Sequence, residues 1–505
     1  MPQLRTAAAA LALTCGIAAC SAGETATQTS QYSADAPGTV VIGLSTAPAS
    51  LDFTTTAGAA IPQALMGNVY EGLVRITQTG RIEAALAQRW EVSDDGQIYT
   101  FHLRKGVTFS NGEAFDANTA KFSIDRVQSD AWSNGLKSKM DVVQSTRVID
   151  SHTLEVRLAH RSNDWLWNMG TLVGAMMHPG GVDKLESEPI GTGPYQVERW
   201  AVGESLALKA RADYWGERPA NERAVLRYFG DANALSNAVR THDVNAVVGL
   251  QSPELLDAIR ADESLSVEVG TTNGEVLLSM NNQRAPFDDV RVRQAVMYGI
   301  DRQAVIDTTW EGYGVDTGGV PAAPTDPWYF ESKRFPYDPQ RAHALMKEAD
   351  AIGTSITISV PSLPYAQSAS ELLYSQLSDI GFDVHIESVE FPAVWLSQVY
   401  KGKDYDLSLV AHVEARDIPT MFGTAEYYLG FDDAEVQRLL NQADTAPESD
   451  YVPTMRQAIE RIVDQAGADT LYNLPSIIVT KDVTGIPVNA VGDGLELAQV
   501  RKEHQ

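Results

Sequence analysis

The sequence predicts a mixed α/β protein built from two or three domains. Its 505 residues are too many for a single hydrophobic core. Between residues 338 and 411, helix patterns and strand patterns alternate, which predicts a largely parallel sheet covered by helices. Residues 80–187 differ, because they contain short strand patterns, hairpin signals and many turns. We therefore expect this segment to form a separate domain.

Strand patterns with a period of two residues support the β part of this prediction. Tyr99, Phe101 and Leu103 alternate with polar residues, as expected for a half-buried strand. A polar turn at 150–152 separates two apolar stretches and predicts a hairpin. Asp94-Asp95-Gly96 suits a tight hairpin turn better than a calcium loop, because the remaining calcium ligands are missing. Further strand-like segments lie at 39–44, 356–360 and 384–386.

Helix signals lie between these segments. Ser252-Pro253 and Asp338-Pro339 each combine an N-cap residue with proline at the first helical position. An apolar stripe covers residues 369–380, and Gly381 is expected to end that helix. Two more stripes, at 439–443 and 458–463, predict helices near the C-terminus.

The N-terminus has the pattern of a secretory signal. Arg5 precedes an apolar run from Ala7 to Ala19 that is too short to cross a bilayer as a stable helix. Small residues before Cys20 resemble a bacterial lipobox, so we expect residues 1–19 to be removed and Cys20 to be acylated. An ordinary signal peptide followed by an unrelated cysteine is the alternative. Residues 20–38 are small and polar, which predicts a flexible tether. The mature protein would then be lipid-anchored at the outer face of the cell membrane or in the periplasm.

Charge and cysteine content exclude several kinds of partner and site. The formal net charge of −27 argues against a nucleic-acid partner, which needs a basic surface. Of the two cysteines, Cys15 lies in the predicted signal and Cys20 is the predicted lipidation site. We therefore expect neither a disulfide nor a thiolate metal site in the mature protein.

The chain carries no local catalytic motif. It lacks G-x-S-x-G, H-E-x-x-H and the GxxxxGK[ST] phosphate loop. The nine histidines are scattered, and none shows metal-ligand spacing. We therefore predict a binding protein without a metal or cofactor, and not an enzyme. A catalytic pair assembled from distant residues, as in a secreted hydrolase, stays open.

Several segments, in order along the chain, resemble one family. They are VYEGLV at 69–74, LAQRWEVSDDG at 86–96, YTFHLRKGVTF at 99–109, GTGPY at 191–195, DYWG at 213–216 and APFDDVRVRQA at 285–295. Together they resemble the bacterial extracellular solute-binding proteins of family 5, the receptors of ABC importers for peptides, nickel and oligosaccharides. The resemblance covers residues 39–480. Most of these segments have architectural roles, so they indicate the family without indicating the ligand.

The resemblance implies a type II periplasmic-binding-protein fold, with two α/β lobes around a cleft and an extra inserted domain. Lobe I is expected to contain residues 39–80, 188–275 and 478–505. Residues 80–187 are expected to form the inserted domain, and residues 276–477 lobe II. Crossover strands near 275–282 and 474–479 are expected to join the lobes, which close over the solute.

The resemblance also implies which residues touch the solute. Family pockets draw on the loop after the first strand, the Tyr-Glu-Gly-Leu segment and the second lobe. These regions correspond here to Ser45, Thr46, Tyr70 and Trp395, together with the loop at 411–417.

An acidic residue of that loop accepts the ammonium group of the peptide in the family's peptide receptors. Glu414 and Asp417 are the two candidates here, beside Arg416. Because the loop departs from the family pattern, either acid could align with the family's ligand. The alternative is that these three residues pair with one another on a solvated loop.

These features predict a solute receptor of an ABC importer, with a short peptide as the favoured solute. A receptor for a metal chelate or an oligosaccharide is the alternative within that class, and a sensor lipoprotein that reuses the fold is another. We expect a monomer that meets the importer's permease subunits and the membrane, the latter through its lipid anchor.

Overall fold

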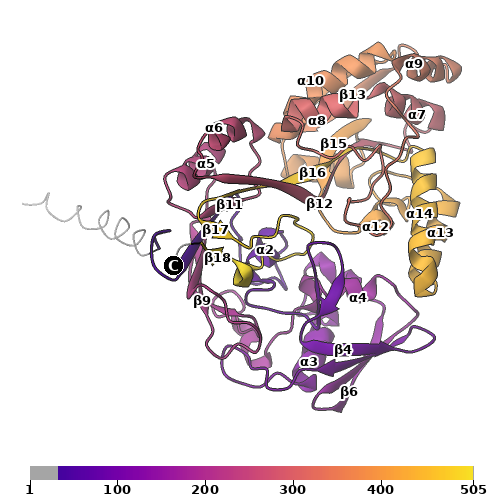
Figure 1. The fold of residues 1–505 in the computed structure, drawn as a ribbon. Helices are drawn as coiled ribbons and strands as arrows, with labels where there is room; N and C mark the ends of the chain where they lie inside the picture. Colours follow the sequence, from indigo (N-terminus) through magenta and orange to yellow (C-terminus); the bar gives the residue numbers. More distant parts are fainter. Residues whose placement is uncertain (1–31, 504–505) are drawn as a thin grey trace, which may run out of the picture.

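The computed structural model describes residues 32–503, so Cys15 and Cys20 lie outside it. Its main element is a ten-stranded mixed sheet that passes from one end of the molecule to the other (Figure 1). In spatial order the strands are β14 (Asp383–Val389), β13 (Ser355–Pro361), β15 (Leu407–His412), β12 (Ser266–Met280), β16 (Asp469–Thr480), β11 (Ala246–Val248), β1 (Thr39–Leu44), β10 (Arg223–Tyr228), β9 (Ser205–Ala210) and β8 (Tyr195–Ala201).

One end of this sheet, which we call lobe II, is a parallel unit covered by helices. Strand β13 is parallel to both β14 and β15, and helices alternate with these strands along the chain. The parallel sheet predicted for residues 338–411 is therefore confirmed. The helices are α7 (Val290–Gly299), α8 (Arg302–Trp310), α9 (Pro339–Glu348), α10 (Pro364–Asp379), α11 (Ala393–Trp395), the π-helix Leu396–Lys401, α12 (Ile418–Phe422), α13 (Ala434–Thr445) and α14 (Glu448–Asp464).

The opposite end, which we call lobe I, is centred on β1. This fully buried strand is parallel to its neighbours β10 and β11, and the antiparallel strands β9 and β8 complete the edge. The lobe also contains the hairpin β2 (Val74–Ile76) and β3 (Ile82–Ala84), the strands β17 (Val483–Thr484) and β18 (Arg501–Lys502), and the helices α2 (Ala60–Leu65), α5 (Ala232–Arg240) and α6 (Leu256–Arg260).

Two helix and linker predictions need correction. Asp338 caps α9 through the Arg341 amide as expected, but the Ser252 side chain makes no capping hydrogen bond, and a short 3₁₀ turn precedes α6. The predicted tether is too long at its C-terminal end. Ala34 is buried against lobe I, and its carbonyl accepts a hydrogen bond from Asn245 Nδ2 at 3.3 Å.

The two long central strands, β12 and β16, connect the lobes. They pair antiparallel from Ser266 opposite Thr480 to Leu278 opposite Asp469. The register shifts between Thr271 and Glu275, so the ladder is interrupted for a few residues in the middle of β12. Such irregularities are common next to functional sites, because they redirect side chains.

A separate four-stranded antiparallel sheet lies beside lobe I (Figure 1). Its order is β4 (Ala87–Val92), β5 (Ile98–Leu103), β7 (Thr153–Leu158) and β6 (Val143–Asp150), and α3 (Ala117–Gln128) and α4 (Trp165–Asn168) accompany it. Both predicted hairpins are present here, β4–β5 and β6–β7. We call residues 87–187 the small-sheet region; its core is continuous with that of lobe I. The inserted-domain boundaries 80–187 stay a prediction.

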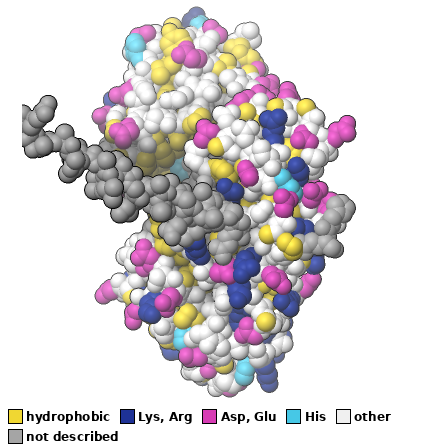
Figure 2. Space-filling view, turned by 90° about the vertical axis from the view of Figure 1, so that its left-hand side faces the viewer, with side chains coloured by type: hydrophobic (Ala, Val, Ile, Leu, Met, Phe, Trp, Pro, Cys, Tyr) yellow, Lys and Arg dark blue, Asp and Glu magenta, His cyan; other side chains and the backbone are white. Residues whose placement is uncertain are grey.

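The surface reflects the acidic composition. On the face seen in Figure 2, acidic side chains are interspersed with Lys and Arg and do not form one continuous patch. Within residues 32–503, no helix has both the length and the apolar character needed to cross a bilayer.

Candidate functional site

Ser45 and Thr46 follow β1 and line a cavity of about 770 Å³. Gly249, which follows β11, and Ser476 of β16 line it too. The cavity therefore lies at the carboxyl ends of two parallel strands, where α/β sheets commonly bind ligands. Its volume is in the range of small-solute pockets. Its lining is mostly small and uncharged, and the charged side chains among the lining residues are Arg75, Asp493 and Glu496.

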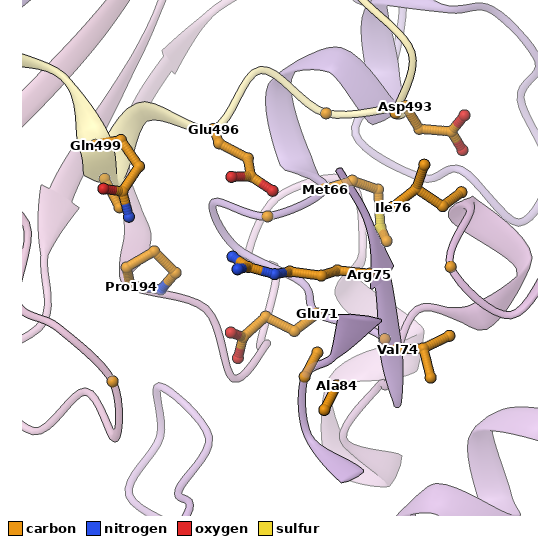
Figure 3. A pocket seen from close by; sticks show the side chains of 18 of the residues that line it. Met66, Glu71, Val74, Arg75, Ile76, Ala84, Pro194, Asp493, Glu496 and Gln499 are labelled. Atoms are coloured by element: carbon orange, nitrogen blue, oxygen red, sulfur yellow. The ribbon is translucent and has the colours of Figure 1, made fainter. Parts of the chain in front are cut away.

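A second cavity, of about 290 Å³, lies next to the first and is shown in Figure 3. The Arg75 side chain lies between Glu71 and Glu496 there, and it also pairs with Glu83 at 3.0 Å. Glu71 is already satisfied by three donors, which are Thr192 Oγ1 at 2.9 Å, Tyr214 OH at 2.8 Å and Trp215 Nε1 at 2.9 Å. These partners make Glu71 a structural residue that ties the segment before β2 to the segments before β8 and after β9.

Tyr70 and Trp395, both predicted to touch the solute, are buried and line neither cavity. The Tyr70 ring packs edge-on against Phe53 at 5.1 Å in the core of lobe I. The Trp395 indole donates to Ser408 Oγ at 3.0 Å and packs near Tyr428 in lobe II. Both side chains therefore contribute packing within their own lobes in this structure.

The loop after β15 is where lobe II meets lobe I and the small-sheet region. Ala415 packs against Ile76, Trp167 and Val491. Arg416 has a left-handed backbone conformation, with φ of 57°. Its guanidinium carbon lies 3.4 Å from the ring centroid of Trp167 and 4.8 Å from that of Trp328. This cation–π sandwich joins the small-sheet region to lobe II.

The two acids of this loop have different surroundings. Glu414 is 57% exposed, and its Oε2 lies 3.8 Å from Lys139 Nζ of the small-sheet region. Asp417 is only 12% exposed, and its nearest ionisable partner is His412, with Nδ1 3.8 Å from Asp417 Oδ2. Burial raises the pKa of Asp417 to about 8, and the charge of Glu414 adds to this shift. Asp417 is therefore the buried acid of the pair, and Glu414 the solvated one.

His412 does not supply a positive charge to Asp417. Burial lowers the pKa of His412 to about 4, so the ring is neutral near pH 7. Its Nε2 lies 2.9 Å from the hydroxyl of Tyr428, which in turn lies 2.6 Å from Ser279 Oγ. The imidazole is thus held in a chain of hydrogen bonds that runs from His412 of β15 through Tyr428 to Ser279 of β12.

Glu275 is a second buried acid at this place, and it comes from the crossover strand β12. It is opposite His412 of β15 and Asn473 of β16, so the three side chains share one face of the sheet. The residue is 5% exposed, and its Oε2 has no hydrogen-bond partner among the described residues. Burial raises its pKa well above the ordinary value, and the charges of Asp417 and Asp326 raise it further.

Asp326 completes the acidic group, but it has a cation beside it. Its Oδ1 lies 3.5 Å from Arg416 Nε. Burial raises the pKa of Asp326 to about 6, and Arg416 opposes that shift. The place where the lobes meet therefore contains two buried acids, Glu275 and Asp417, that form no ion pair with a lysine or an arginine of the described residues, and it can accept a positively charged group.

This acidic group lies behind the wall of the larger cavity. Ile76 and Val491 line that cavity on one side and contact Ala415 of the loop on the other. Asp493 also lines the cavity; burial raises its pKa, the charge of Lys139 opposes that shift, and the charge of Glu414 adds to it. The larger cavity and the buried acids are thus neighbouring parts of one region. No group of three or more potential metal ligands is present in the described part of the chain.

Sequence reasoning missed Glu275, Asp326, Lys139 and the tryptophans that flank Arg416. One signal was available for Glu275, because this acid begins the apolar run Val276–Met280, where an ionised side chain is out of place. The others come from distant segments that only the fold brings together.

Comparisons with known proteins agree with this architecture. The dipeptide-binding protein of Escherichia coli K12 is 27% identical over 361 residues, which cover 65% of this chain and 66% of that protein. The glutathione-binding protein GsiB of Salmonella choleraesuis is 28% identical over 341 residues, or 65% of each chain. The matched stretch thus spans just under two thirds of each relative's length.

Solved structures extend the similarity in fold to nearly the whole chain. The periplasmic binding protein DppA of Helicobacter pylori, in complex with the peptide STSA, has a TM-score of 0.78 and 24% identity, and the match covers 92% of this chain and 98% of that one. NikA of Brucella suis, in complex with Fe(III)-EDTA, has a TM-score of 0.79 and 21% identity, covering 92% and 99%. The α/β periplasmic-binding-protein fold expected from the sequence is confirmed.

The family follows from the sequence itself. The model of the bacterial extracellular solute-binding proteins, family 5 (middle region), matches residues 81–432, well over half of the chain. The segments that suggested this family lie largely within that range. The protein therefore belongs to family 5 of the bacterial extracellular solute-binding proteins.

Proposed function

We propose that this protein is the solute receptor of an ABC importer and that its solute is a short peptide with a free amino terminus. The observation that carries the proposal is the carboxylate of Asp417, which is buried on the loop after β15 and has no cation beside it. Burying an unpaired carboxylate is costly, whereas an ammonium group offers it three charge-assisted donors. Of the two predicted acids, Asp417 is the one that fits this role, because Glu414 is exposed and lies near Lys139.

The same acids argue against the alternative solutes. An anionic metal chelate would meet Glu275, Asp417 and Asp326 together, and an oligosaccharide offers no cation to them. Ser45 and Thr46 also support the peptide proposal, because most of the residues that line their cavity are small and uncharged and suit uncharged parts of a peptide. The relatives named for dipeptide and glutathione binding point to the same class of solute.

The test is calorimetric titration with matched ligands. Alanyl-alanine, trialanine and glutathione are each compared with their N-acetylated forms. We expect only free-amine ligands to bind, and to raise the melting temperature by a free energy of RT ln(1 + [L]/Kd). The bound ligand should be recovered chemically unchanged, and small-angle scattering should record compaction. Equal affinity for both forms, or turnover of the ligand, would refute the proposal.

We also propose that Cys20 carries a lipid anchor, which places the protein at the outer membrane face or in the periplasm, where it meets the permease as a monomer. Cys20→Ala should move the protein from the membrane fraction to the soluble fraction without changing its melting temperature. Retention of the variant in the membrane fraction would contradict the anchor. A sensor lipoprotein would differ by failing to stimulate uptake when added to its permease.

A further inference from the structure

Glu275 is the least compensated charge in the region where the lobes meet. It lies in the centre of the main sheet, directly after the register shift of β12, and is 5% exposed. No ion pair or hydrogen bond of its side chain is recorded within residues 32–503, and its Oε2 is buried without a partner. A carboxyl group in this position lowers the stability of the empty protein, because it loses hydration and gains no bond. A residue with only a structural role would be apolar or paired.

The nearby cations are already engaged. Lys139 lies beside Glu414 at 3.8 Å, and Arg416 lies beside Asp326 at 3.5 Å between its two tryptophans. His412 is neutral and bonded to Tyr428. The remaining acids are Glu275 and Asp417. The charge of Asp417 adds to the burial that raises the pKa of Glu275, and Glu275 lies opposite the last residue of β15, the strand that the Asp417 loop follows. Neither acid forms an ion pair with a lysine or an arginine among residues 32–503, although the charge of Lys139 acts on Asp417.

We propose that Glu275 is a second carboxylate ligand of the solute, so that Glu275 and Asp417 hold one ammonium group between them. This inference rests on the proposed function and sharpens its solute class. Two acceptors on one nitrogen require at least two N–H donors, so primary and secondary amines fit and quaternary amines do not. An N-acylated solute also fails, because it has no charge to offset the two acids.

Occupancy by an ammonium group changes the protonation of the pair. In the empty site burial raises the pKa of both acids, so the protonated, neutral form of each is favoured. When the cation arrives, both groups bind it as carboxylates, and the protons that they carried leave to solvent. The other charged or titratable groups around the pair are Glu414, Asp326, His412, Arg416, Lys139, Tyr427 and Tyr428.

The experiment compares Glu275→Gln with Glu268→Gln, the same substitution at an exposed position on the same strand. Each variant and the wild type are titrated with alanyl-alanine, trialanine and glutathione in phosphate and in Tris buffer, which differ in ionisation enthalpy. The difference between buffers gives the number of protons released. Glutamine keeps the shape and offers one acceptor, so folding is preserved; melting temperatures of the empty proteins check this.

The expected result is a loss of affinity of about tenfold or more for Glu275→Gln, as for a lost hydrogen bond to a charged group, with reduced proton release and an unchanged Glu268→Gln. The empty Glu275→Gln protein should melt no lower than the wild type. If Glu275→Gln binds as the wild type does, with the same proton release, the inference is wrong while the peptide receptor stands. If the wild type binds none of the free-amine probes, or binds their N-acetylated forms equally well, the proposed function fails and this inference with it.

Discussion

Two of the contacts between lobe II and the rest of the molecule differ in how their polar groups are paired. The first is the docking contact, in which residues 162–164 of the small-sheet region meet the turn between α13 and α14. Asn163 Nδ2 donates to the carbonyls of Ala443 at 2.7 Å and Ala446 at 3.0 Å, and Ser162 Oγ donates to Asp444 at 2.8 Å. The second is the acidic contact, formed by the loop 411–417 with Glu275.

The polar groups of the docking contact form hydrogen bonds with one another. Helix α13 ends at Thr445, so its last carbonyls need external donors, and Asn163 supplies them. The Asp164 amide donates to Asp444, and the Tyr451 hydroxyl donates to Asp164. In the acidic contact, by contrast, Glu275 and Asp417 are buried without a cation. We infer that the docking contact, whose polar groups have partners in the empty protein, positions the lobes. The acidic contact, whose buried acids lack a partner cation, indicates the charge of the group that the protein binds.

The largest effect expected in this comparison is on stability, from Arg416→Ala. Removal of the guanidinium leaves Asp326 buried without a counterion and empties the space between Trp167 and Trp328. We expect a loss of about 3–5 kcal/mol in the free energy of unfolding, as for one partner of a buried ion pair. Chemical denaturation measures it. Arg334→Ala, which removes an exposed pair with Asp464, is the control and should cost about 0–1 kcal/mol.

Asp417→Asn should have the next largest effect, on solute binding. We expect affinity for free-amine peptides to fall by about 2–5 kcal/mol, the range for truncating a buried charge pair. The fold should persist, since the loop lies outside the strands. Asp379→Asn, at an exposed helix end, is the matched control for calorimetry. An unchanged affinity in Asp417→Asn would place the ammonium group elsewhere.

The same substitution should alter the pH dependence of stability in the empty protein. Asp417 titrates near 3.8 in the unfolded chain and at about 8 when folded, so folding takes up a proton between these values. The contribution of Asp417 to the free energy of unfolding is therefore largest below about pH 4 and decreases as the pH rises toward 8. His412 has the opposite slope between 6.5 and about 4, and it is common to both proteins. Between pH 6.5 and 8, where His412 no longer contributes, urea unfolding should show a falling stability for the wild type and a flatter profile for Asp417→Asn.

The docking contact predicts a smaller effect, independent of the ligand's charge. Asn163→Ala leaves the carbonyls of Ala443 and Ala446 without their donor. We expect a loss of about 1–3 kcal/mol in stability and a weaker affinity for every ligand alike, because the lobes are less well positioned. Asn441→Ala, exposed on α13, is the control. A loss confined to free-amine ligands would show that this contact belongs to the solute site.

The sequence predicted the fold far better than the site. Periodic strands, the capped helix at Asp338 and the alternation at 338–411 are local patterns, and local patterns determine elements and sheet type. Whether an acid is buried depends on segments far apart in the chain. Asp417 and Glu414 are three residues apart and look alike in sequence, yet of the two only Glu414 forms an ion pair with Lys139, and the strand register places Glu275 beside His412. These contacts form only when the fold brings β12, β15 and the small-sheet region together.

The smallest expected effect separates the two acids of the loop. Glu414→Gln removes a 57% exposed charge that lies 3.8 Å from Lys139, so the free energy of unfolding should change by less than about 1 kcal/mol. Affinity for free-amine peptides should change by less than about tenfold, because Glu414 is not the buried ligand. Since the charge of Glu414 raises the pKa of Asp417, its removal makes Asp417 easier to ionise. Binding of alanyl-alanine should therefore persist to lower pH in Glu414→Gln than in the wild type. If Glu414→Gln lost its affinity and Asp417→Asn kept it, Glu414 and not Asp417 would be the acid that binds the ammonium group.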